Sequence, residues 1–78
     1  MMHMVYVSID MAATGQKIDR LRKERNISVA QMVNGLGLTS PRAYYKWRSG
    51  KCLPSIDNLC VLSAMLQTTI DELIVRAA

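Results

Sequence analysis

The chain has 78 residues, of which 50% are hydrophobic and 21% are charged, and its formal net charge is +4. A chain of this length forms one small domain and buries about 60% of its unfolded surface, which leaves little room to enclose a substrate. No apolar run approaches the roughly 18 residues that span a membrane, and two cysteines with one histidine cannot form a four-ligand zinc site.

These features exclude several classes of protein. We expect no enzyme, because the sequence offers no nucleophile paired with a base and no metal cluster. The first residues lack the basic and long apolar segments of a signal peptide, so we expect a cytoplasmic protein, and we expect no cofactor. Cys52 and Cys60 are interpreted as small core or surface residues in a reducing compartment, with a disulfide or a reactive thiol as the alternative.

Residues 5–10 alternate between apolar and polar side chains, with Val5, Val7 and Ile9 on one side. This alternation is typical of a β-strand, and nothing else in the sequence has a strand pattern. Three interpretations remain open: the segment pairs with a second copy, packs on the domain as an extended arm, or is disordered. We therefore divide the chain into an N-terminal arm, residues 1–13, and a helical domain, residues 14–78.

The first two helices are marked by their capping residues. Thr14 is expected to cap a helix over about residues 15–25. Ser28 and Gln31 have the spacing of a capping box, in which the hydroxyl accepts from one backbone N–H and the amide side chain reaches back to another. This box predicts a second helix over about residues 29–36.

Three further helices follow the same rules. Ser40 is expected to be the N-cap of a helix over about residues 41–49, with Pro41 at the position that has no N–H to lose. A fourth helix is expected over about residues 56–66, and Thr69 opens a short last one. The sequence therefore predicts an all-α fold of five helices around a single core.

The helix over residues 41–49 carries two contrasting faces. Its inner face is formed by Ala43, Tyr44 and Trp47, which are three or four positions apart. Its outer face is formed by Arg42, Tyr45, Lys46 and Ser49. Every outer side chain can donate a hydrogen bond, and Arg or Lys in the major groove can donate to guanine O6 and N7. The competing interpretation is an ordinary amphipathic helix with a polar outer face.

The positive charge is concentrated in one part of the chain. Residues 16–51 hold nine of the ten basic residues but only two of the six acidic ones. Such a concentration is expected of a surface that binds nucleic acid. A basic surface that serves only solubility is the alternative.

A capped helix, a glycine-bearing turn and a second helix together make a helix-turn-helix. In this setting the chain resembles the Cro/repressor-type (XRE) helix-turn-helix family over about residues 15–75. The runs that carry the resemblance are SVAQMV at 28–33, LGL at 36–38, AYYKWRSGK at 43–51, LPS at 53–55, LSAML at 62–66 and IDEL at 70–73. The resemblance implies a five-helix, lambda-repressor-like domain that binds duplex DNA, usually as a dimer, and regulates transcription.

The resemblance also implies which residues meet DNA. The helix at about 41–49 would be the recognition helix in the major groove, and Trp47 matches a core position. Base contacts are expected from Arg42, Tyr45 and Lys46. Phosphate contacts are expected from Ser28, Ser40, Arg48, Ser49 and Lys51.

Three departures from the family pattern bear on these expectations. Val29 stands where many members have a Gln that reaches phosphate, and the turn before Ser40 is one residue longer than the commonest form. Arg48 stands where an acidic residue is frequent, and Arg22 is its expected basic counterpart. We therefore expect these two cations to be left unpaired and available to phosphate.

The sequence thus predicts a sequence-specific regulator of transcription that binds double-stranded DNA. It is expected to act as a homodimer, joined either through the strand at residues 5–9 or through the surface around Leu66 and Ile74. The alternative is an antitoxin-like or other protein-interaction module built on the same fold.

Overall fold

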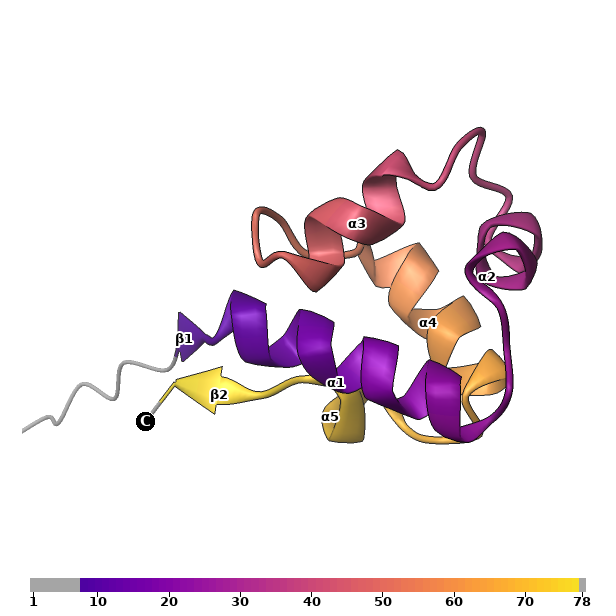
Figure 1. Cartoon of the computed structure of the whole chain (residues 1–78). Helices are drawn as coiled ribbons and strands as arrows, with labels where there is room; N and C mark the ends of the chain where they lie inside the picture. The colour runs from indigo at the N-terminus through magenta and orange to yellow at the C-terminus, as the bar shows by residue number, and fades with distance from the viewer. Residues whose placement is uncertain (1–7, 78) are drawn as a thin grey trace, which may run out of the picture.

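The computed structural model describes residues 8–77 and contains the five expected helices (Figure 1). The elements in chain order are β1 (Ser8–Ile9), α1 (Met11–Glu24), α2 (Val29–Gly35), α3 (Arg42–Arg48), α4 (Ile56–Met65), α5 (Ile70–Leu73) and β2 (Arg76–Ala77). The mainly helical fold predicted from the sequence is confirmed. Within the described part of the chain, no helix is both long and apolar enough to cross a membrane.

The predicted capping box at the start of α2 is present in both directions. The Ser28 hydroxyl accepts from the Gln31 backbone N–H at 3.0 Å, and the Gln31 side chain accepts from the Ser28 N–H at 2.8 Å. The Thr69 hydroxyl likewise accepts from a backbone N–H at the start of α5. Both caps join residues three positions apart, so the local sequence was enough to predict these two.

Two helix starts differ from the prediction. Helix α1 begins four residues early, because Asp10 accepts from the Ala13 N–H at 2.9 Å and is the N-cap. Thr14 therefore lies inside α1, where its buried hydroxyl bonds to the Val75 backbone. Helix α3 begins at Arg42, one residue late, and the Ser40 hydroxyl makes only a long bond of 3.3 Å to the Arg42 N–H.

The expectation that the chain has no second strand was wrong. Strand β1 pairs antiparallel with β2, with Ser8 opposite Ala77, and the Asp10 N–H extends the ladder to the Val75 carbonyl at 2.8 Å. A two-residue strand such as β2 is too short to show alternation, so sequence pattern does not reveal it. Val5 and Val7 lie outside the described residues, so pairing of the arm with a second copy stays a prediction.

All five helices contribute to the core. Its buried hydrophobic residues are Ile18, Met32, Tyr44, Trp47, Leu59, Leu62, Leu66 and Leu73. Trp47 is 4% exposed, as its expected core position requires. Leu66 is fully buried, so it cannot belong to the dimer surface that the sequence suggested around it.

Helix α3 packs directly against the backbone of α1 at Gly15. A Cβ atom at Gly15 would lie 1.8 Å from the Trp47 carbonyl oxygen, so any side chain larger than hydrogen would displace α3. This contact explains a glycine inside a helix, where it otherwise costs about 1 kcal/mol relative to alanine. It also fixes the depth at which α3 sits on the domain.

Candidate nucleic-acid interface

Helix α3 lies on one side of α1, and α5 and β2 lie on the other (Figure 1). The inner face of α3 is buried: Tyr44 is 1% exposed, and its ring meets the Trp47 ring edge-on at 6.2 Å between centroids. Its outer face, Arg42, Tyr45, Lys46 and Ser49, is exposed along the whole helix. The two faces predicted from the helical period are therefore both present.

Most of the expected contact residues gather in one place. An open depression of about 640 Å³ is lined by Ser40, Pro41, Arg42, Tyr45, Lys46, Arg48, Ser49 and Lys51. This set contains all three expected base-contacting residues and four of the five expected phosphate-contacting ones. Ser28 is the exception: it is exposed at the start of α2, and its hydroxyl is engaged in the capping box.

The cations of this surface are not neutralised by the part of the protein that the structure describes. Among residues 8–77, none of Arg42, Lys46, Arg48 and Lys51 forms an ion pair with a carboxylate. The Arg48 guanidinium instead lies over the ring of Tyr45, 4.6 Å from its centroid. A cation over an aromatic face keeps its charge and its hydrogen-bond donors. The surface is thus suited to an anionic partner.

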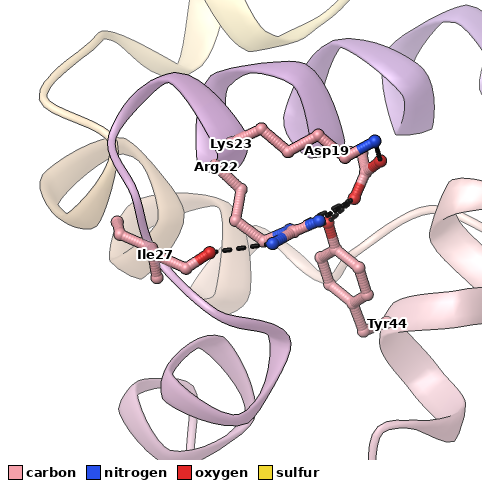
Figure 2. A network of polar contacts seen from close by, with 5 residues as sticks. All are labelled: Asp19, Arg22, Lys23, Ile27 and Tyr44. Carbon is pink, nitrogen blue, oxygen red and sulfur yellow. Dashed lines mark hydrogen bonds and ion pairs between the residues drawn. The ribbon is translucent and has the colours of Figure 1, made fainter.

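The expectation for Arg22 was wrong, because Arg22 is not left unpaired. Figure 2 shows its side chain at the centre of a polar network between α1 and α3. Its Nη2 donates to Asp19 Oδ1 at 3.0 Å, its Nε to the Tyr44 hydroxyl at 2.9 Å and its Nη1 to the Ile27 carbonyl at 2.8 Å. The Tyr44 hydroxyl in turn donates to Asp19 Oδ1, and Lys23 lies 3.3 Å from Asp19 Oδ2. Of the two cations expected to be available to phosphate, Arg22 and Arg48, only Arg48 remains so.

The protonation states in this network are fixed by its geometry. Burial raises the pKa of the Tyr44 hydroxyl to about 12, and its bond to the Asp19 carboxylate acts in the same direction. Burial alone would raise the pKa of the Asp19 carboxyl, but hydrogen bonds from Tyr44, Arg22 and Lys23 and the charge of Arg22 hold this pKa below 3.8. Near neutral pH, Asp19 is therefore a carboxylate and Tyr44 a neutral donor to it.

Sequence reasoning missed the role of Asp19 in this site. A usable signal was present, because Asp19 precedes Arg22 by three positions and Lys23 by four on one helix, which are the spacings of helical ion pairs. The bond to Tyr44 joins residues 25 positions apart, and no local pattern indicates it.

Comparison with known proteins identifies the family of this domain. The sequence pattern of the Cro/C1-type HTH DNA-binding domain matches residues 17–78. The cryptic phage CTXphi transcriptional repressor RstR of Vibrio cholerae serotype O1 is 36% identical over 63 residues, which are 81% of this chain and 55% of the repressor. The chain thus spans about half the length of this relative.

Two solved structures are similar to the fold. The P22 c2 repressor protein, solved in complex with a synthetic operator, is 32% identical with a TM-score of 0.70, covering 77% of this chain and 89% of the repressor chain. The restriction-modification controller protein C.AhdI from Aeromonas hydrophila is 23% identical with a TM-score of 0.72, covering 82% of this chain and 96% of its own. The second likeness concerns the fold alone. Together they confirm the five-helix, lambda-repressor-like architecture.

Proposed function

This chain belongs to the Cro/C1-type helix-turn-helix DNA-binding domain family, and we propose that it is a sequence-specific regulator of transcription. The observation that carries the proposal is the outer face of α3, where one open surface is lined by hydrogen-bond donors and by cations that have no ion-pair partner among residues 8–77. The similar CTXphi protein is a transcriptional repressor, and the P22 c2 repressor was solved on an operator, which supports the same role here.

We propose that α3 enters the major groove, because its outer face presents donors at positions that follow the groove. Arg42 and Lys46 carry two of them one helical turn apart and are assigned to base edges. Tyr45 is 41% exposed, and its ring lies beside them, supported by Arg48. It can donate to a base or contact a thymine methyl group.

Phosphate contacts are assigned to both ends of this surface. Ser40 lies before α3, and Arg48, Ser49 and Lys51 lie at its end, so a strand on either side of the groove meets donors. Ser28 contributes at the exposed start of α2. The start of a helix generally presents backbone N–H groups that have no partner within the helix. These contacts set position and affinity, while the base contacts set the preferred sequence.

We further propose that the protein acts as a homodimer, because one helix-turn-helix reads about half a site. Two copies on DNA place their recognition helices about 34 Å apart. Two candidates could hold the copies together: the strand expected at residues 5–9, most of which lies outside the described residues, and the exposed face of α4. Ile56 on α4 is 72% exposed, the largest value among the exposed large hydrophobic side chains of the described residues.

The regulator proposal is tested by selecting bound sequences from a random duplex library. We expect enrichment of a two-fold symmetric sequence with half-site centres about ten base pairs apart. A library in which no sequence is enriched would contradict the proposal.

The dimer proposal is tested by sedimentation of the whole chain, of the chain that begins at Ser8, and of Ile56→Asp. The cut before Ser8 keeps the Asp10 cap and the β1–β2 pair, so the domain is expected to stay folded. We expect a wild-type dimer and one variant that shifts to monomer, which identifies the contact. A wild-type chain that is monomeric both alone and on its preferred DNA contradicts the proposal.

A further inference from the structure

We propose that Asp19, Arg22 and Tyr44 form a positioning cluster that sets DNA sequence selectivity without touching DNA. The inference rests on the proposed function and adds to it three residues at the junction of α1 and α3, on the side of α3 that faces away from the proposed DNA surface. The cluster fixes how α3 is rotated and where it lies relative to the start of α2. These two quantities decide whether base-facing and phosphate-facing groups meet the same duplex in register.

One guanidinium joins the three segments concerned. Arg22 projects from α1 and bonds to Tyr44 on α3, while its Nη1 bonds to the carbonyl of Ile27. Ile27 immediately precedes Ser28, the N-cap of α2. The planar guanidinium holds its donors in fixed directions, so the α3 contact and the α2 contact cannot move independently.

Burial makes these bonds effective as constraints. The side chains of Arg22 and Asp19 are only 12% and 10% exposed, and Tyr44 is 1% exposed. In such surroundings water has little access to replace a lost partner, so displacing a donor or acceptor costs free energy. No buried side-chain N or O atom of the described residues lacks a partner, so the present orientation of α3 satisfies the whole cluster.

The cluster controls rotation in a way that apolar packing does not. Trp47 packs one turn further along α3 and secures its depth, but contact between apolar surfaces is non-directional. The Tyr44 hydroxyl adds a directional bond beside the base-facing residue Tyr45. Because α3 is a rigid helix, a rotation that moves Tyr44 moves Arg42, Tyr45 and Lys46 with it.

The test compares two isosteric losses of a buried hydroxyl. Tyr44→Phe keeps the ring and removes the bonds to Asp19 and Arg22. Thr14→Val is the matched control, because Thr14 is equally buried at 1% and its hydroxyl bonds to the Val75 backbone, away from the outer face of α3. Each variant is measured by circular dichroism for folding and by titration with two duplexes, one carrying a single preferred half-site and one scrambled.

We expect Tyr44→Phe to lower the ratio of the two affinities about tenfold, the discrimination carried by one base contact. Its affinity for the scrambled duplex and the salt dependence of that binding should change little, because every phosphate-facing cation is kept and non-specific binding needs no register with the bases. Thr14→Val should keep the wild-type ratio. A Tyr44→Phe protein with the wild-type ratio, or a Thr14→Val protein with the same loss, would overturn the inference.

Arg22→Lys extends the test, since an ammonium keeps the charge but cannot bond to Asp19, Tyr44 and Ile27 in the same fork. We expect Arg22→Lys to show the same loss of selectivity. If Tyr44→Phe does not fold, the result for Arg22→Lys tests the inference in its place. If neither variant folds, the cluster serves folding rather than orientation and the inference is wrong. A wild-type chain that does not distinguish the two duplexes would overturn the proposed function instead.

Discussion

Helices α1 and α3 both carry several positive charges, and they use them in opposite ways. On α1, Lys17, Arg20, Arg22 and Lys23 all pair with carboxylates, at 3.9, 3.1, 3.0 and 3.3 Å. The cations of α3 and the turn after it form no ion pair among residues 8–77. Net charge over a segment therefore overstates the binding surface, and the distribution of carboxylates locates it.

The difference between the two helices has a simple origin in the sequence. Asp19 or Glu24 lies three or four positions from Arg20, Arg22 and Lys23, and Lys17 pairs with Glu72 on α5. By contrast, no acidic residue occurs between Glu24 and Asp57. A cation on a helix without a carboxylate on the neighbouring turns has no local partner. The cations of α1 are thereby neutralised by carboxylates of the domain, whereas α3 keeps its charge for a ligand.

The contact between the two helices can be broken at one atom. Gly15→Ala places a methyl group 1.8 Å from the Trp47 carbonyl oxygen, and the obstacle is backbone, which cannot rotate away. We expect a loss of at least about 3 kcal/mol from a total near 5 kcal/mol. Thermal unfolding followed by circular dichroism should show a midpoint lower by about 15 °C or more.

Gly37→Ala provides the matched control for this variant. Gly37 has a positive φ of 68°, but a Cβ there meets nothing within 4 Å. Only the left-handed backbone opposes the substitution, at a cost of about 1–2 kcal/mol. If Gly15→Ala and Gly37→Ala lost the same stability, α1 and α3 would be packed less closely in solution than in the structure.

Alkaline pH offers a second way to weaken the junction. The Tyr44 pKa of about 12 lies above the ordinary value of 10.0, so the unfolded chain releases this proton first as pH rises. The raised pKa of Tyr44 therefore adds to the free energy of unfolding, by up to roughly 2–3 kcal/mol. This gain is complete below pH 10 and is lost between about pH 10 and 12. Denaturant unfolding of the wild type and Tyr44→Phe should show a stability difference that shrinks over this range. A difference that is constant from pH 9 to 11 would contradict the shift.

The junction between α1 and α3 also marks the limit of what sequence predicts. The capping box at Ser28 and the two faces of α3 were found because both depend on spacings within one or two turns. The start of α1 was missed because Thr14 and Asp10 are both good caps, and the bond from Thr14 to Val75 joins positions 61 apart. The Asp19–Tyr44 bond was missed for the same reason of distance along the chain.

Replacing single basic residues by alanine tests whether α3, and not α1, binds DNA. Arg42→Ala and Lys46→Ala should each weaken binding to the preferred site by about tenfold to hundredfold, because each removes a base contact. Arg20→Ala on α1 should change it less than about twofold, since Arg20 is paired with Glu24 on the solvent side. Affinities for preferred and scrambled duplexes check this, and a larger effect at Arg20 would extend the DNA surface onto α1.

The smallest expected effect separates a phosphate contact from a base contact. Lys51 follows α3 and lines the same surface without an acidic partner among the described residues, so we assign it to one phosphate. Lys51→Ala should weaken all duplexes alike and reduce the slope of log affinity against log salt by about one unit, because one fewer counterion is released.

Lys17→Ala is the matched control for Lys51→Ala, because both remove one lysine charge from the same molecule. Lys17 pairs with Glu72 on α5, which lies on the opposite side of α1 from α3 (Figure 1). If only total charge mattered, the two variants would lower affinity equally. We expect the salt slope to fall for Lys51→Ala and to stay at the wild-type value for Lys17→Ala. Equal slopes would mean that long-range attraction to the whole protein, rather than contact at the end of α3, holds the phosphate backbone.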